Sequence, residues 1–100
     1  MPEVRAVVEK VRSKNAGPFW VTVDIFCGSQ EAFERVKSGL ATEAVAARFD
    51  VPAQLLKRFD IESLRVVKIS VPRPTVQGTV TDRDMHGAGW AALVAEMAID

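Results

Sequence analysis

The sequence predicts one α+β domain, in which helices pack on a single face of a small antiparallel sheet. Residues 19–26 and 65–71 alternate in the way that half-buried strands do. Residues 30–59, between them, have the apolar spacing and capping residues of helices. The apolar side chains of both segments need one common cover, so we expect the two strands to pair in one sheet. The length of 100 residues, 48% of them hydrophobic, suits a single domain over residues 1–100 with one core.

The sequence does not distinguish between helix and strand for the N-terminal segment. Residues 4–11 fit a short helix and a strand about equally well. The run Asn15-Ala16-Gly17-Pro18 has turn chemistry, because asparagine and glycine tolerate positive φ and proline cannot continue a helix. We therefore expect a loop before the first clear strand.

That strand, residues 19–26, separates two kinds of side chain. One face carries only apolar residues, and the other combines Asp24 with aromatic side chains. The residues of the two faces are Phe19, Val21, Val23 and Ile25, and then Trp20, Thr22, Asp24 and Phe26. We expect the second face to be partly covered and partly exposed.

The helical block begins after Gly28. Ser29 is a suitable N-cap for a helix starting at Gln30, and Thr42 for a second helix over 43–49. Pro52 suits the first turn of a third short helix, which would hold Leu55, Leu56 and Phe59.

The C-terminal third combines a strand, a polar stretch and an alanine-rich tail. Residues 65–71 form the second clear strand, and residues 75–84 are polar and rich in turn formers. Residues 89–99 favour a helix, which could end in a short strand.

Charge and cysteine content exclude several classes of protein. Thirteen basic residues balance thirteen acidic ones, so neither nucleic acid nor a membrane surface is an expected partner. We expect no export or membrane-spanning segment. The single cysteine, Cys27, favours a buried thiol in a reducing cytoplasm, and with one histidine it makes a protein metal site improbable. We expect no cofactor.

The segment before the first strand carries an unusual density of polar groups, and it is our candidate anion site. Arg12 offers a planar fork for a carboxylate, Lys14 a point charge and Asn15 an orienting amide. Ser13 lies between them, and Gly17 lets a ligand approach the backbone. The alternative is a solvated turn.

A second basic segment, residues 65–74, could join this site. It contains Arg65, Lys68 and Arg73 and no acid. Arg73, clamped between Pro72 and Pro74, would reach the first segment if the strand ends coincide. The alternative is an ordinary mixed surface.

Two further residues could move protons. His86 is the only histidine, and histidine is the usual acid or base near neutral pH; a surface residue is the alternative. Asp24 could act as a base if its strand face is covered, or it could be a structural partner for Arg12 or Lys14.

The run Arg12 to Phe19, with Thr22, Asp24, Ile25 and Phe26 after it, resembles the signature of the domain-of-unknown-function family 4387. Lys68-Ile69, Pro72-Arg73-Pro74 and Gly87-Ala88 also match that family. At the tail the sequence departs from the family pattern, with Gly89-Trp90 where a glutamine is expected. The family looks related to the C-terminal ferredoxin-like domain of AtuA, the acyclic terpene utilisation proteins, which implies a ferredoxin-like fold.

The resemblance also implies a role beside a larger AtuA-type subunit. The pair would form a heteromeric hydratase or dehydratase, a lyase acting on an unsaturated organic acid or acyl-CoA. We assign Lys14, Asn15, Asp24 and His86 to catalysis, and Arg12, Ser13, Gly17 and Arg73 to substrate binding. Two alternatives stay open: a non-catalytic module that positions the large subunit, with Trp20 and Trp90 as anchors, and a ligand-binding dimer working alone. In each case we expect an oligomer.

Overall fold

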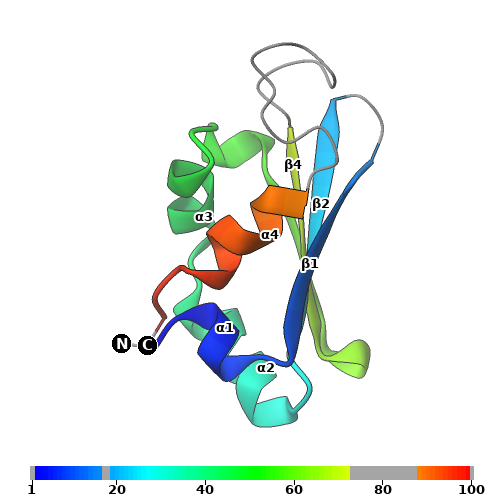
Figure 1. The fold of residues 1–100 in the computed structure, drawn as a ribbon, viewed down its shortest axis with the longest axis vertical. Coiled ribbons are helices and arrows are strands. Elements are labelled where there is room, and N and C mark those ends of the chain that lie inside the picture. The colour runs from blue at the N-terminus through cyan, green and yellow to red at the C-terminus, as the bar shows by residue number, and fades with distance from the viewer. Residues whose placement is uncertain (1, 17–18, 73–87, 100) are drawn as a thin grey trace.

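The computed structural model describes residues 2–16, 19–72 and 88–99, and it shows a four-stranded antiparallel sheet with its helices on one face (Figure 1). The predicted fold class is confirmed. In chain order the elements are α1 Val4–Val7, β1 Lys10–Asn15, β2 Trp20–Phe26, α2 Gln30–Gly39, α3 Thr42–Arg48, the 3₁₀ turn η1 Ala53–Leu55, β3 Lys57–Ile61, the 3₁₀ turn η2 Glu62–Leu64, β4 Val66–Pro72 and α4 Ala88–Ala95.

The two strands expected from the sequence lie side by side at the centre of the sheet. The order is β1-β2-β4-β3, and β2 pairs with β4 antiparallel, with Val23 opposite Ile69. From β2 onward the chain runs strand, helices, two strands and helix, as in a ferredoxin-like fold. The strand that ends such a fold is here β1, which comes from the N-terminal side of the chain.

The two chain ends meet, as this arrangement requires (Figure 1). The backbone N–H of Val4 donates to the carbonyl of Met97 at 2.8 Å, and that of Ile99 donates to Pro2 at 2.8 Å. Glu3 and Ala98 form an antiparallel bridge. The chain therefore forms the helix α4 over Ala88–Ala95 and then a single bridged residue, Ala98. This agrees with the expectation of a helix over residues 89–99 that could end in a short strand.

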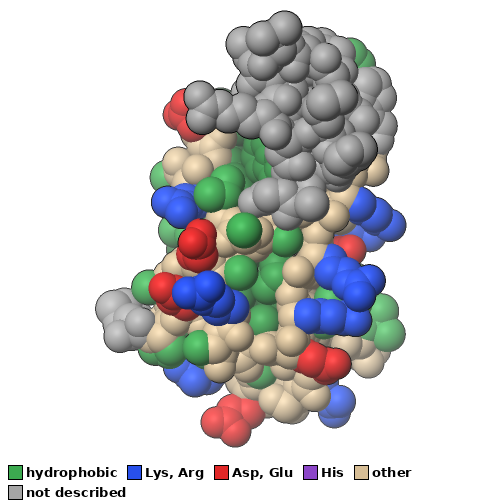
Figure 2. Space-filling view, viewed as in Figure 1, with side chains coloured by type: hydrophobic (Ala, Val, Ile, Leu, Met, Phe, Trp, Pro, Cys, Tyr) green, Lys and Arg blue, Asp and Glu red, His purple; other side chains and the backbone are tan. Residues whose placement is uncertain are grey.

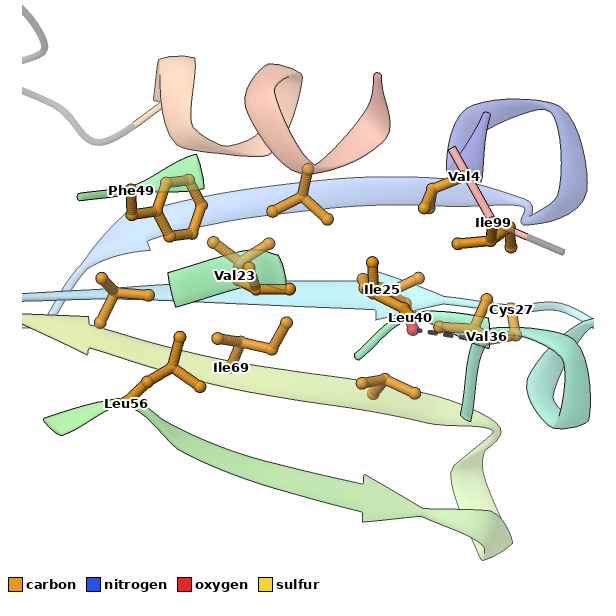
Figure 3. Close-up of a cluster of buried hydrophobic side chains, with 14 of the residues drawn as sticks. Val4, Val23, Ile25, Cys27, Val36, Leu40, Phe49, Leu56, Ile69 and Ile99 are labelled. Carbon is orange, nitrogen blue, oxygen red and sulfur yellow. Dashed lines mark hydrogen bonds between the residues drawn. The ribbon is translucent and has the colours of Figure 1, made fainter. Parts of the chain in front are cut away.

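The core lies between the sheet and the helices (Figure 3). Alternate residues of β2 and β4 point to this side and expose no surface, and α2 and α3 supply the cover. The buried side chains at its centre are Val21, Val23, Ile25, Val67, Ile69, Val71, Phe33, Val36, Leu40 and Val45. Among the described residues no helix is long and apolar enough to cross a bilayer.

The helix starts agree in part with the sequence. The side chain of Ser29 accepts a hydrogen bond from the Ala32 N–H at 3.1 Å and caps α2 as predicted. In α3, by contrast, Ala41 stands at the N-cap and Thr42 is the first helical residue. No side chain caps α3.

The prediction of a third short helix that holds Leu55, Leu56 and Phe59 is wrong. After η1 the chain enters β3, which pairs with β4. Only Leu56 of the three apolar residues is buried. A strand is favoured here for two reasons. Its alternation places Arg58 toward the helices and Phe59 toward the other face. It also supplies hydrogen-bond partners for the backbone groups on the second edge of β4.

The N-terminal segment resolves into both of its candidate structures. Val4–Val7 form the single-turn helix α1, and Lys10–Asn15 form β1, which pairs with β2. Of the loop expected over residues 12–18, residues 12–15 are therefore in a strand. They belong to an unbroken ladder of paired residues, from Lys10 opposite Phe26 to Asn15 opposite Val21. Gly17 and Pro18 of the expected turn lie outside the described residues.

Arg58 ties β3 to the end of α2. Its guanidinium donates to the carbonyl of Lys37 at 3.1 Å and to that of Leu40, and it pairs with Asp60 at 3.0 Å. The Arg58 side chain is 12% exposed. The last carbonyls of a helix have no partner within the helix, so this cation satisfies acceptors that would otherwise lie partly buried and unpaired.

Replacing this cation should measurably weaken the fold. We expect Arg58→Met, which keeps the apolar stem but removes the donors, to lower the free energy of unfolding by about 2 kcal/mol. Arg48→Met, at an exposed position at the end of α3, should change it by less than about 0.5 kcal/mol. Urea unfolding of both variants measures the difference, and equal midpoints would refute the role given to Arg58.

Gly28 should not tolerate a side chain. Its φ is +84°, and an added Cβ would lie 2.9 Å from Oε2 and 3.1 Å from Cβ of Glu9. We expect Gly28→Ala to destabilise the protein by about 1–2 kcal/mol. Gly39→Ala, in the last turn of α2, should be neutral or stabilising. Thermal unfolding of the two variants checks the contrast.

Candidate functional site

The face of the sheet away from the helices is strongly cationic. Ser13 in β1 faces the helices, since its Oγ accepts from the Ala91 N–H of α4 at 3.0 Å. Its neighbours Arg12 and Lys14 therefore project from the other face. Figure 2 shows Lys and Arg side chains gathered along this side of the sheet. We call it the open face.

Strand register places opposite charges in one row across the open face. Arg12 of β1 lies opposite Asp24 of β2, and Asp24 lies opposite Lys68 of β4. The next row holds Lys14, Thr22, Ser70 and Lys57. The two basic segments of the sequence thus meet through Lys68. The ends of β1 and β4 also coincide, since Asn15 and Val71 both lie opposite Val21, while Arg73 itself lies outside the described residues. Among the described strand residues of this face, Asp24 is the one acid beside the cations Lys10, Arg12, Lys14, Lys57 and Lys68.

A pocket of about 310 Å³ opens beside β1 on this face. Its lining residues are Arg12, Ser13, Lys14, Asp24 and Phe26, and all but Phe26 are among the predicted site residues. The Ser13 hydroxyl points to α4 instead, so the predicted side chains that face this pocket are those of Arg12, Lys14 and Asp24. Within the described ranges Arg12, Lys14 and Asp24 form no ion pair. Their charges are therefore available to a ligand, and Phe26 adds an apolar wall.

The structure separates the remaining predicted residues from this group. Asn15 shares its side of β1 with Ser13, so it does not point with Arg12 and Lys14. Gly17, Arg73 and His86 lie outside the described residues. Phe26 was not assigned to the site from the sequence, although it alternates with Asp24 along β2. Lys68 was noted only as part of the second basic segment, and the register places it directly opposite Asp24.

The two tryptophans occupy different environments. The ring of Trp90 packs against Phe49 with centroids 4.8 Å apart, next to the core. Trp20 lies on the open face, where the Lys57 ammonium sits 5.3 Å from its ring centroid. Trp20 therefore remains at a surface, whereas Trp90 contributes to packing.

Cys27 has the properties of a core residue. It is 3% exposed, and its Sγ lies 3.7 Å from the carbonyl oxygen of Ile25. Burial, with a smaller contribution from Asp60, raises the pKa of the Cys27 thiol to about 11. A thiol needs to ionise to act as a nucleophile or ligand. In the described part of the chain no three His, Cys, Asp or Glu side chains come together in the manner of a metal site.

These features define a small α+β protein with a ferredoxin-like sheet and a cationic pocket on its open face. A family model described as Domain of unknown function (DUF4387) matches residues 4–98, and the chain belongs to this family. The match confirms the resemblance found in the sequence. No curated protein and no solved structure matches the chain.

The pKa of Cys27 predicts a loss of stability at high pH. The folded state favours the neutral thiol, so its contribution is fully present below about pH 9 and is lost as the pH rises toward about 11. Cys27→Ala should remove this part of the pH dependence. Urea unfolding of both proteins at several alkaline pH values measures it, and parallel pH profiles would contradict the assignment.

Proposed function

We propose that this chain is the small subunit of a two-component AtuA-type enzyme, in which the open-face pocket holds the carboxylate or thioester oxygen of an unsaturated substrate. The observation that supports this most directly is the pocket lined by Arg12, Lys14 and Asp24. Its cations stand on a strand of the sheet rather than on a loop, so they are positioned before a ligand arrives. The single buried thiol suits a reducing cytoplasm, where we expect the enzyme to act.

The proposed reaction explains the need for cations. Hydration of a double bond conjugated to a carbonyl adds hydroxide to the β-carbon and a proton to the α-carbon. Negative charge develops on the carbonyl oxygen as an enolate before the α-carbon is protonated. Donors held at that oxygen stabilise the transition state. Arg12 would bind the oxygen as a fork, Lys14 would supply a point charge, and Asp24 would be the carboxylate in reach for proton transfer.

The openness of the pocket explains the need for a second subunit. Arg12 and Lys14 are both exposed. Two unit charges 4 Å apart interact by about 1 kcal/mol in bulk water, and by about 4 kcal/mol near a protein surface of lower dielectric constant. A larger subunit that covers the open face would exclude water and strengthen the electrostatic attraction between each cation and the substrate oxygen. In the described part of the chain, the pocket has the cations but is open to solvent.

A non-catalytic interaction module is the second candidate, and the same openness favours it. An acidic side chain of the large subunit could enter the pocket between Arg12 and Lys14 in place of a substrate. The two functions differ in what the loss of one cation does to assembly and to turnover.

Lys14→Ala should separate them in the complex reconstituted with the AtuA-type protein of the same genome. If the pocket binds substrate, turnover should fall by about 10²–10³-fold while the complex persists. If the pocket is interfacial, the complex should dissociate. Lys37→Ala, in the last turn of α2 on the helical side, is the matched control and should alter neither. Full turnover and full assembly in Lys14→Ala would refute both roles.

A further inference from the structure

Exposed apolar side chains concentrate around β3. Among the described residues four large hydrophobic side chains are at least half exposed, and three of them belong to this region. Phe59 in the middle of β3 is 51% exposed, Leu55 just before it 50% and Leu64 just after it 68%. Phe19 is the fourth. The three residues lie before, within and after β3, along one edge of the sheet.

β3 also has an unpaired edge. It is the outermost strand in the order β1-β2-β4-β3, and its one strand partner in the described sheet is β4. The outer backbone groups of an edge strand form a template for another strand. The edge position therefore points to strand addition, and Phe59 projects from the open face, where it can contact a residue of an added strand.

The sequence of β3 is complementary to itself in one antiparallel register. Paired residues project to the same face, so a symmetric pair must be centred on a residue. Centring on Arg58 places two arginines opposite each other, and centring on Asp60 places two aspartates opposite each other, which is unfavourable. Centring on Phe59 instead places Arg58 opposite Asp60 twice and Phe59 opposite Phe59.

The other edge of the sheet offers no such register. The side chains of Lys10, Arg12 and Lys14 alternate along β1 on the open face. Symmetric pairing centred on any residue from 11 to 14 puts one of these cations opposite another. Like charges in this position repel, and lysines on an edge strand are a usual protection against pairing. Of the two sheet edges, β3 alone is suited to a second copy.

We propose that the chain forms a two-fold symmetric dimer through antiparallel pairing of β3 with β3 of a second copy, centred on Phe59. The pairing joins the two sheets into one of eight strands, with all helices on one side. It brings the start of one β3 beside the end of the other, so that Leu55 lies near Leu64 of the second copy. A strand of five residues forms a small interface, so the dimer dissociates in the micromolar range.

Sedimentation and light scattering of the purified chain test the dimer. From low to several hundred micromolar, the mass should rise from 10.9 kDa toward twice that value. Phe59→Lys places like charges at the centre of the pair and should weaken association at least tenfold. Phe19→Lys, at an equally exposed position outside β3, should associate like the unmodified protein. A monomer at every concentration, or equal behaviour of the two variants, would overturn the proposal.

Cross-linking tests the register without depending on how a charge affects folding. Phe59→Cys should form a disulfide-linked dimer on mild oxidation, because the two Cβ atoms lie opposite each other. Lys57→Cys should not link to itself, but it should link to Ile61→Cys when the two are mixed. The native Cys27 is buried and should stay unlinked. Self-linking of Lys57→Cys with none at position 59 would exclude the register, whatever the pocket binds.

Discussion

The alternation of side chains along β2 is the constraint on which both the core and the open face depend. β2 is a central strand, bonded to β1 on one side and to β4 on the other. Val21, Val23 and Ile25 expose no surface. Since the period of a strand is two, Asp24 and Phe26 must then point away from the helices. A slip of one residue would bury Asp24 and expose three branched apolar side chains, so packing of the core holds the pocket residues on the opposite face.

The position of β1 extends this constraint to the chain ends. β1 carries Arg12 and Lys14, yet the strand follows α1, a helix of only four residues, which is too short to be stable alone. Burial of Val4 and the hydrogen bond from its N–H to Met97 hold α1 against the tail after α4. In a ferredoxin-like fold a covalent link would join that tail to the last strand. Here backbone pairing between the two ends replaces the link, and the geometry of the cationic edge depends on it.

The sequence pattern predicts an element correctly where one of its faces is buried. It fails where pairing with a distant strand determines the secondary structure. The strands ending at Phe26 and Val71 and the Ser29 cap followed from alternation and capping chemistry. β3 did not, because four of the five residues of Lys57–Ile61 are charged or aromatic, and its structure comes from pairing with β4 and from the contact of Arg58 with α2. Arg12, Lys14 and Asp24, assigned to the candidate site from the sequence, line one pocket of the structure. Asn15 points to the other side because β1 alternates as a strand, and the place of Lys68 beside Asp24 depends on a register between two strands.

The proposed dimer and the proposed site do not compete for the same surface, and this follows from the strand order. β3 and β1 are opposite edges of one sheet. A two-fold axis perpendicular to the sheet joins the β3 edges and keeps both open faces on the same side. The pockets beside β1 then lie at the two far ends of a continuous eight-stranded surface, with Lys57 and Lys68 between them. The electrostatic field of these cations is screened in water and becomes strong only when a covering surface excludes solvent. The larger subunit that we propose, laid across this surface, would exclude solvent from both pockets at once, and pairing of the two β3 edges would present both pockets to it on one side.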